Sequence, residues 1–186
     1  MHRLFLALRP PAAVRDPLLD LMEDGMPVRW QDEEQLHVTL RFIGEVERPV
    51  AEDLAAHLAA FRFDPLEATL DGVGRFARRR GGALWAGVAP KEPLRALAAR
   101  LDRLCQGVGL APERRAYHPH LTVARWSGAE PAAVGRWLER HARLSGPSWS
   151  IGRVTLFESR LHRAGASYEV VLEVPASDGQ GLPEGA

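Results

Sequence analysis

Histidine and threonine alternate with apolar residues in one short stretch of the chain. Residues 36–43 carry an apolar side chain at every second position, which is the period of a half-buried strand. The polar side chains of His37 and Thr39 therefore share the opposite face of that strand. Because a strand rises about 3.3 Å per residue, their backbones lie about 6–7 Å apart on this face. One imidazole and one hydroxyl are thus directed at the same region of space.

The same pattern occurs a second time, 83 residues further along the chain. His120 and Thr122 flank Leu121, and Val123 completes a second His-apolar-Thr-apolar motif. A single copy is typical of any strand with a polar face turned to water. Two copies, one in each half of the chain, indicate a duplicated unit whose halves face each other across a cleft. Since an imidazole titrates near pH 6.5, His37 and His120 can serve as acid and base near neutral pH.

Two His-x-Thr-x motifs are the signature of the 2H phosphoesterases, and the chain resembles that family. More narrowly, it is similar to the bacterial and archaeal RNA 2′,3′-cyclic phosphodiesterases, which are also called 2′-5′ RNA ligases. The matching stretches span residues 3 to about 174, which is nearly the whole chain. Besides the first motif they are Arg3–Leu8 with Pro10 and Pro11, Phe42–Val46, Tyr117–Arg125, and Val154–Phe157 leading to Gly165 and Tyr168.

The resemblance implies that water opens a cyclic phosphodiester, and it assigns roles to both motifs. His120 would be the base that activates water, and His37 the acid that protonates the departing 3′-oxygen, leaving a 2′-phosphate. The residues alone allow the reverse assignment. Thr39 and Thr122 would hydrogen-bond the non-bridging phosphate oxygens, where negative charge develops. The alternative for the threonines is the ordinary preference of β-branched residues for strands.

Arg125 and Tyr168 complete the site that the resemblance implies, as contacts to the phosphate or to another part of the substrate. Strict alternation from Thr122 would turn Arg125 to the other face of its strand, whereas the family motif places an arginine there. By the same alternation Arg41 is expected to face the cleft beside His37, although no family signature supports it. Several aromatic residues could stack a base, with core packing as their default role: Phe5, Phe42, Trp85, Trp149, Phe157 and Tyr168.

A zinc site is the rival interpretation of the second motif. His118 and His120 are separated by one residue and could bind zinc together, with His37 as the third ligand. Pro119 disturbs the strand between them, however, and the threonines would have no role as ligands. We therefore expect no metal and no cofactor, and we expect His118 to support the site structurally.

The composition excludes several classes of protein. The chain has 186 residues, of which 46% are hydrophobic and 26% charged, and its formal net charge is zero. A strongly basic protein that coats nucleic acid is thus not indicated, although the composition does not exclude a local basic patch. Arg75–Arg80 could be such a patch near the cleft, or the solvated tip of a hairpin. Cys105 is the single cysteine, so no internal disulfide is expected.

The chain shows no signal peptide and no run of about 20 apolar residues that could span a bilayer. We therefore expect a cytoplasmic protein without a membrane partner, acting as a monomer. Residues 1–175 are predicted to form a single two-lobed domain. Residues 176–186 are rich in Gly, Pro and Ser, and we expect them to form a disordered tail.

The resemblance implies an α+β fold of two pseudo-symmetric lobes around a central cleft, the 2H phosphoesterase or LigT-like fold. Each lobe would be a mostly antiparallel sheet with outer helices. The patterns agree with that order, and the hairpin between the third and fourth strands is expected at Arg75–Gly82. We expect strands near 3–8, 36–43, 65–74, 82–89, 117–125, 149–158 and 168–174, and helices near 12–24, 49–61, 93–106 and 130–143.

The leading functional prediction is a metal-independent RNA 2′,3′-cyclic phosphodiesterase. Its substrates would be RNA ends or nucleotides that carry a 2′,3′-cyclic phosphate. The alternative within the family is an enzyme that acts on 2′-5′ linked oligonucleotides or other cyclic nucleotides, including reversible 2′-5′ ligation of RNA. A non-catalytic module that binds RNA or nucleotides is the alternative of another class, and the intact pair of motifs argues against it.

Overall fold

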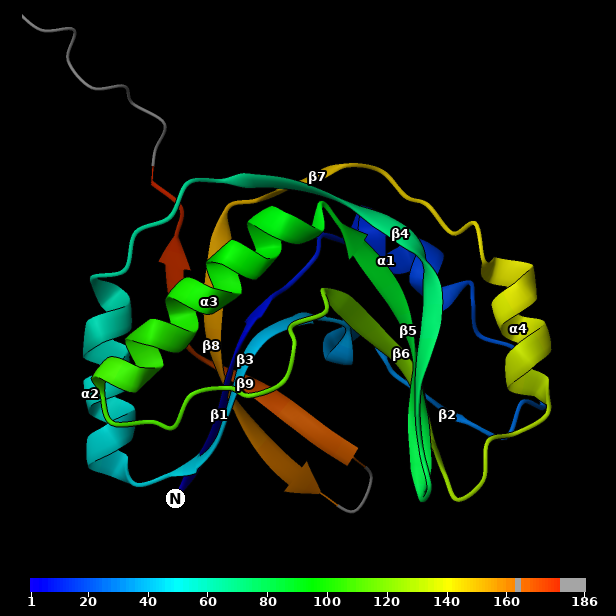
Figure 1. The fold of residues 1–186 in the computed structure, drawn as a ribbon, viewed down its shortest axis with the longest axis horizontal. Helices are drawn as coiled ribbons and strands as arrows, with labels where there is room; N and C mark the ends of the chain where they lie inside the picture. Colours follow the sequence, from blue (N-terminus) through cyan, green and yellow to red (C-terminus); the bar gives the residue numbers. More distant parts are fainter. Residues whose placement is uncertain (163–164, 178–186) are drawn as a thin grey trace, which may run out of the picture.

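The computed structural model describes residues 1–162 and 165–177, and in them nine strands and four α-helices (Figure 1). The strands are β1 (His2–Leu8), β2 (Arg29–Trp30), β3 (Val38–Val46), β4 (Leu66–Arg78), β5 (Gly81–Ala89), β6 (His120–Ser127), β7 (Trp149–Ile151), β8 (Arg153–His162) and β9 (Gly165–Pro175). The helices are α1 (Ala12–Leu19), α2 (Arg48–Ala59), α3 (Lys91–Gly107) and α4 (Ala133–His141), with a 3₁₀ turn η1 (Glu33–Gln35). The strand pairs are antiparallel, which confirms the predicted α+β class.

One sheet runs through the molecule and divides into two halves at its centre. Its strand order is β7-β4-β5-β6-β3-β1-β8-β9, with β2 paired to β6. The two motif strands, β3 and β6, are therefore neighbours, and each is the innermost strand of its half. They join through the pair Val38 and Leu121, each of which directly follows a motif histidine. The pseudo-symmetry axis consequently passes between the two motifs.

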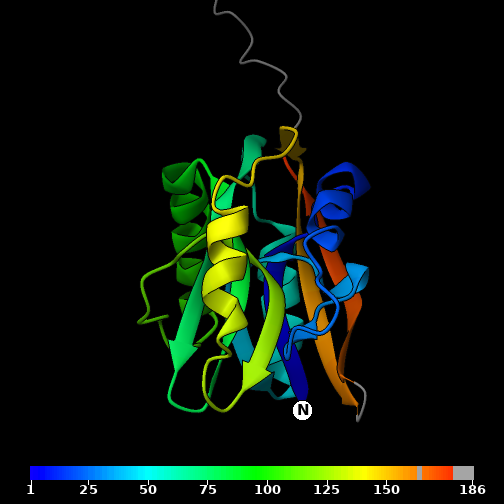
Figure 2. The same cartoon turned by 90° about the vertical axis from the view of Figure 1, so that its right-hand side faces the viewer.

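Two of the four described helices cross from one half of the sheet to the other. Figure 1 shows α2 and α3 beside β1, β3, β8 and β9, whereas α1 and α4 lie beside β4, β5 and β6. Figure 2 shows α4 on the outside of its half. Each half thus receives one helix that follows its own motif strand and one that crosses over from the other half. None of the described helices is long and apolar enough to cross a membrane.

Strand β1 is an interior strand, as predicted, because its apolar run is buried on both faces. One face joins the main core through Leu4, Leu6 and Leu8. The other face contributes Phe5 and Ala7 to a smaller apolar cluster next to the motif residues. Burying a large apolar side chain contributes about 1.5–3 kcal/mol, so β1 anchors the centre of the sheet.

The boundaries of α1 and β6 differ from the predicted ones. Helix α1 was expected over 12–24 but ends at Leu19. The amides of Leu21 and Met22 donate to the carbonyls three residues back, of Leu18 and Leu19, so the chain closes in tight turns instead of continuing as an α-helix. Strand β6 begins at His120, three residues later than predicted. Pro119, which has no amide hydrogen, directly precedes it.

The hairpin between β4 and β5 is longer than predicted. Instead of a connection over Arg75–Gly82, the strands stay paired up to Arg78 opposite Gly81. Glycine makes the close pairing possible, because a Cβ on Gly82 would overlap the indole of Trp126. Most of the predicted loop is therefore rigid strand, and the turn is confined to two residues.

The predicted strand over 149–158 is two strands that serve different halves of the sheet. The chain is divided at Gly152, so that β7 pairs with β4 whereas β8 pairs with β1 and β9. Strand β9 starts at Gly165, before the predicted range of 168–174. This pairing lets the final hairpin complete the half that contains β3.

The first two residues of the predicted tail are hydrogen-bonded to the domain. The amide of Ala176 donates to the Gly152 carbonyl at 2.8 Å. The amide of Ser177 donates to the Phe63 carbonyl, also at 2.8 Å. The rest of the predicted tail, residues 178–186, lies outside the described residues.

Candidate active site

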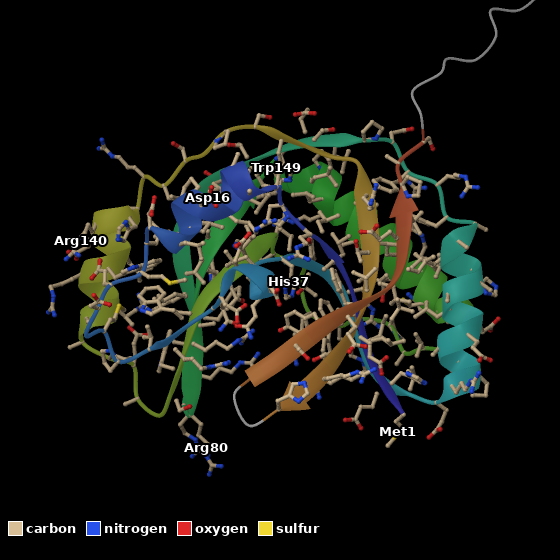
Figure 3. All side chains as sticks on the ribbon, turned by 180° about the vertical axis from the view of Figure 1, so that it is seen from behind. Met1, Asp16, His37, Arg80, Arg140 and Trp149 are labelled. Carbon is tan, nitrogen blue, oxygen red and sulfur yellow. The ribbon has the colours of Figure 1, made fainter. Side chains whose placement is uncertain are left out.

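A cavity of about 230 Å³ lies where the two halves of the sheet meet, and all six predicted site residues line it. Strand β3 and the residue before it supply His37 and Thr39; β6 and β9 supply the others, which are His120, Thr122, Arg125 and Tyr168. Figure 3 shows His37 near the middle of the molecule. The structure adds lining residues that the sequence had not assigned to the site: Arg3, Gln31, Gln35, Ser159 and Ala166, together with Phe5 and Phe42, which were considered only as stacking candidates.

The central strand pair explains how the two motifs come together. Its two members, Val38 and Leu121, are fully buried, so their side chains face the core and their neighbours face the cavity. Continued antiparallel register places His37 across from Thr122. Each histidine therefore faces the threonine of the other motif, rather than only the threonine of its own.

A β-bulge follows the first motif threonine and reverses the alternation of β3. Consecutive residues of β1 pair with Thr39 and Arg41, which leaves Leu40 as the extra residue. Arg41 consequently turns to the core and forms an ion pair with Asp102 of α3 at 2.7 Å. Phe42 lines the cavity instead. The prediction that Arg41 faces the cleft was wrong, because alternation along one strand cannot reveal a bulge.

A second bulge follows the second motif threonine and brings Arg125 to the cavity. Consecutive residues of β5 pair with Ala124 and Thr122, so Val123 is the extra residue. Arg125 therefore lies on the cavity face of β6, where the resemblance had implied it. Arg125 follows Thr122 at the same spacing at which Phe42 follows Thr39. Comparing the two motifs position by position could have identified Phe42 as a site residue.

His37 is enclosed by aromatic rings. The ring centroids of Phe5 and Tyr168 lie 4.9 Å and 5.2 Å from that of the imidazole, with Tyr168 edge-on. Burial lowers the pKa of His37 from 6.5 to about 4, and the positive charge of Arg125 acts in the same direction. The Gln35 carbonyl acts in the opposite direction, but Nδ1 of His37 has no hydrogen-bond partner of good geometry among the described residues. His37 is therefore neutral at pH 7 in the free protein.

His120 has a fixed orientation. Its Nδ1 lies 2.6 Å from the carbonyl oxygen of His118, to which the neutral ring can donate its one proton. Phe76 packs edge-on against the ring, with centroids 4.9 Å apart. Burial lowers the pKa of His120 as well, and the backbone carbonyl of His118 partly offsets this. The neutral ring then directs the lone pair of Nε2 away from the backbone, which is the form that a general base requires.

Gln31 is a site residue that the sequence did not suggest. Its side chain is only 4% exposed, it lines the cavity, and its Nε2 is buried without a partner in the described part of the chain. Its backbone amide donates to the carbonyl of the bulge residue Val123 at 2.8 Å. An unpaired buried amide is costly, so this donor is available for a ligand. No local pattern around Gln31 distinguishes it from other polar loop residues.

The histidines proposed as zinc ligands are arranged differently from a metal site. His118 packs its ring against Trp85 at 4.6 Å and lies 6.0 Å from the ring of His120. In residues 1–162 and 165–177, no three His, Cys, Asp or Glu side chains are grouped so that they could hold a metal ion. His118 instead contacts the site through its carbonyl, which orients His120.

Comparisons with known proteins show the family of the chain. Residues 28–163 match the model of the 2′-5′ RNA ligase superfamily. The RNA 2′,3′-cyclic phosphodiesterase of Aeropyrum pernix is 35% identical over 170 residues, which cover 89% of this chain and 94% of that protein. The enzyme of the same name from Escherichia coli is 32% identical over 131 residues, which cover 67% of this chain and 72% of that protein.

Solved structures share the fold. The crystal structure of E. coli LigT complexed with 3′-AMP superposes with a TM-score of 0.78 at 24% identity, covering 95% of this chain and 99% of that one. The crystal structure of a Thermus thermophilus protein, TT0787, gives a TM-score of 0.74 at 25% identity, covering 95% of this chain and 100% of that one. With the matched family model and two converging His-x-Thr-x motifs, these relationships show that the chain belongs to the 2′-5′ RNA ligase superfamily of 2H phosphoesterases.

Proposed function

We propose that the protein is an RNA 2′,3′-cyclic phosphodiesterase that hydrolyses a 2′,3′-cyclic phosphate end to a 2′-phosphate. The observation that carries this proposal is the convergence of both His-x-Thr-x motifs on one cavity. The name shared by the relatives from A. pernix and E. coli supports the same activity. Since the lining residues come from one chain, we expect a monomer to suffice, and we expect it to act in the cytoplasm.

His120 removes the proton from the attacking water. Its Nδ1–H is directed to the His118 carbonyl, so Nε2 is free to accept a proton. The water oxygen forms a bond to phosphorus while the bond from phosphorus to the 3′-oxygen breaks. His37 donates a proton to that departing oxygen. One proton is thus taken up and one delivered, and exchange with solvent restores both histidines.

The substrate itself prepares His37 for the role of acid. In the free protein the pKa of His37 is about 4, which is too low for it to carry a proton at pH 7. A cyclic phosphodiester brings one negative charge into the cavity, and a nearby opposite charge favours the protonated imidazole. Binding of substrate and protonation of His37 are therefore coupled.

The remaining polar residues of the cavity hold the phosphate. The hydroxyl groups of Thr39 and Thr122 donate hydrogen bonds to the non-bridging oxygens of the phosphate, one from each motif strand. Arg125 supplies positive charge, and the unpaired Nε2 of Gln31 supplies another donor. Such preorganised donors stabilise the charge that develops on the phosphate in the transition state. Tyr168 contacts the substrate beside His37.

The direct test is turnover of 2′,3′-cyclic AMP, with ³¹P NMR locating the phosphate of the product. We expect a 2′-phosphate, and we expect the same rate in excess EDTA because two histidines supply both proton transfers. A 2′-5′ linked dinucleotide and a pair of RNA ends for ligation complete the panel. Binding without turnover of any cyclic substrate would favour a binding module. Loss of activity in EDTA and its return with Zn²⁺ would favour the metal interpretation.

A further inference from the structure

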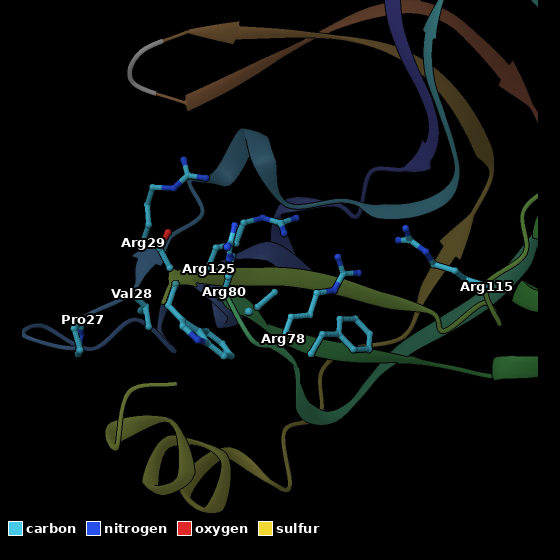
Figure 4. A pocket seen from close by; sticks show the side chains of 13 residues that line it. Pro27, Val28, Arg29, Arg78, Arg80, Arg115 and Arg125 are labelled. Atoms are coloured by element: carbon cyan, nitrogen blue, oxygen red, sulfur yellow. The ribbon is translucent and has the colours of Figure 1, made fainter. Parts of the chain in front are cut away.

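A second, larger hollow adjoins the cavity and is lined by arginine. Its volume is about 950 Å³, against about 230 Å³ for the cavity that contains the histidines. Five arginines from separate parts of the chain line it (Figure 4), namely Arg29, Arg78, Arg80, Arg115 and Arg125. We call this hollow the arginine groove. It includes two members of the Arg75–Arg80 cluster, which the sequence left as either an RNA contact or a solvated hairpin tip.

The positive charge of the arginine groove is not neutralised by the protein. No aspartate or glutamate is among its described lining residues, and none of its guanidinium groups has a carboxylate within ion-pair distance in the described structure. By contrast, Arg75 on the same strand pairs with Glu130 at 2.9 Å. Burial lowers the pKa of the Arg125 guanidinium, and the positive charges of Arg29 and Arg78 lower it further, so these groups are near enough to repel one another. Because the chain as a whole has zero net charge, this local excess of positive charge favours the binding of an anionic ligand.

The arginine groove adjoins the cavity of the motif histidines. Arg125 lines both of them. Phe76 lines the arginine groove, is 39% exposed, and lies 4.9 Å from the ring of His120. An exposed aromatic ring within a basic groove is the combination by which proteins hold single-stranded nucleic acids, since bases stack on the ring while phosphates follow the charges.

We propose that the arginine groove binds the phosphate backbone of a single-stranded RNA whose 3′ end enters the cavity. This inference rests on the proposed function for the identity of that end. Arg29, Arg78, Arg80 and Arg115 contact successive phosphates, and Phe76 stacks a base next to the reacting nucleotide. The groove is about four times as large as the cavity, and its charges come from β2, β4, the following turn, the segment before β6 and β6 itself. This spread suits a chain of phosphates better than the clustered phosphates of one nucleotide.

The test separates binding in the groove from catalysis. A fluorescein-labelled single-stranded decaribonucleotide with an ordinary 3′-hydroxyl is titrated with the protein, and its anisotropy is followed at several salt concentrations. For single strands, log K falls with log[salt] by about 0.7 per phosphate neutralised, so four arginines give a slope of about −2.8. We expect affinity to rise with RNA length and then level off, and we expect ATP to compete weakly.

The informative variant is the double substitution Arg78→Gln/Arg80→Gln. We expect it to weaken RNA binding at least tenfold at low salt and to reduce the salt slope by about 1.4. The matched control is Arg103→Gln/Arg136→Gln, which removes two exposed arginines of α3 and α4 that lie outside the groove. We expect the control to bind RNA like the unaltered protein.

Two results would overturn the proposal. One is equal RNA affinity and an equal salt slope in the Arg78→Gln/Arg80→Gln variant and the control. The other is ATP binding as tightly as the decaribonucleotide, which would assign the groove to a single nucleotide. Because the probe has no cyclic phosphate, these results are independent of turnover. Failure to hydrolyse 2′,3′-cyclic AMP would instead refute the proposed function and leave the RNA-binding result standing.

Discussion

His37 and His120 occupy equivalent motif positions but have different surroundings. His120 has its Nδ1 directed to a backbone carbonyl at 2.6 Å, which fixes the tautomer that leaves Nε2 as acceptor. Nδ1 of His37 has no partner of good geometry among the described residues, and aromatic rings surround the imidazole. The first arrangement suits a base at rest, and the second suits a group whose protonation depends on an arriving anion. The surroundings of the two rings therefore support the proposed roles of His120 as base and His37 as acid.

Removing either histidine should abolish most of the activity. We expect His37→Ala and His120→Ala each to lose on the order of 10²–10⁴-fold in kcat, the usual contribution of a general acid or base. The double variant should lose much less than the product, because the two groups act as a unit. A substrate with a better leaving group than the 3′-oxygen should rescue only His37→Ala.

The matched control for these variants is His57→Ala, since His57 is exposed on α2. It should turn over 2′,3′-cyclic AMP at the unaltered rate. Rescue of His120→Ala in place of His37→Ala would reverse the assignment of acid and base. An active single variant would show that the motifs are not a catalytic pair.

Burial of neutral His37 should make the stability of the fold sensitive to mild acid. The pKa of His37 is 6.5 when unfolded and about 4 when folded, so between these values the unfolded state binds more protons. Its contribution to stability is complete above pH 6.5 and is lost as the pH falls toward 4. We expect a loss of about 2 kcal/mol in the free energy of unfolding between pH 7 and pH 5.

Urea unfolding at both pH values measures this effect, and His37→Gln is the reference because glutamine does not titrate. On going from pH 7 to pH 5, the free energy of unfolding should fall more in the unaltered protein than in His37→Gln. Parallel pH dependence of the two proteins would show that His37 titrates normally.

Gln31 should be more important for activity than for stability. Its Nε2 is buried and unpaired in the described structure, so Gln31→Leu removes a costly group from the free protein. We expect an unchanged or higher Tm, together with a loss of about 10- to 100-fold in kcat/KM, the value of a hydrogen bond to a charged phosphate. Gln106→Leu, an exposed change on α3, is the control. A lower Tm with full activity would assign Gln31 a structural role only.

At the scale of elements, two bulges at equivalent positions shape the site. Each follows a motif threonine and adds the third residue beyond it to the cavity face. In β3 that residue is Phe42 and in β6 it is Arg125. At this position one half of the sheet therefore contributes an aromatic ring to the cavity, and the other half contributes a positive charge. The two bulges give both positions the same geometry, and the different residue types give them different chemical roles.

The β4–β5 hairpin depends on glycine where it crosses Trp126. A Cβ on Gly82 would overlap that indole and the Phe76 carbonyl, so we expect Gly82→Ala to lower stability by about 1–3 kcal/mol through overpacking. Gly107→Ala at the end of α3 is the control. A Cβ there meets no atom within 4 Å, and alanine should raise stability by up to about 1 kcal/mol.

Thermal unfolding of both glycine variants, followed by circular dichroism, provides the measurement. RNA binding by Gly82→Ala should weaken as well, because Arg78 and Arg80 lie on the distorted hairpin. A Gly82→Ala protein with unchanged Tm would show that the hairpin adjusts freely.

At the scale of the molecule, the exchange of helices makes the two halves interdependent. Helices α1 and α3 each leave one half and pack beside the other, and a single main core includes residues of both. Two separately folding lobes are therefore not expected, although the halves are pseudo-symmetric. The cavity between them is held by shared packing and not only by one strand pair.

This architecture predicts a single cooperative unfolding transition. All the tryptophans belong to β2, β5, β6, β7 or α4, hence to one half or its edge, whereas helices occur in both. Tryptophan fluorescence and far-UV circular dichroism should consequently give coincident urea transitions. Two separate transitions would show that the halves unfold independently.

Arg125 and Tyr168 were indicated only by the family resemblance. The sequence by itself determined the two motifs, the cavity-facing positions of their histidines and threonines, and the main helices and strands in their order. These features depend on neighbouring residues, because the period of two along a strand is a local property. The predicted burial of β1 was confirmed for the same reason. The start of β6 was predicted three residues too early, because Pro119 has no amide hydrogen with which to extend the strand pairing.

Only the tertiary structure decided the positions of Arg41, Phe42 and Gln31 and the arginine groove. A bulge is a mismatch between two paired strands, so it is invisible along either strand alone. Gln31 belongs to the site because its backbone bonds to the bulge at Val123, more than 90 residues away. The arginines converge from segments that no local pattern connects. Folding brings like charges together there because the packing of the sheet outweighs their repulsion in solvent.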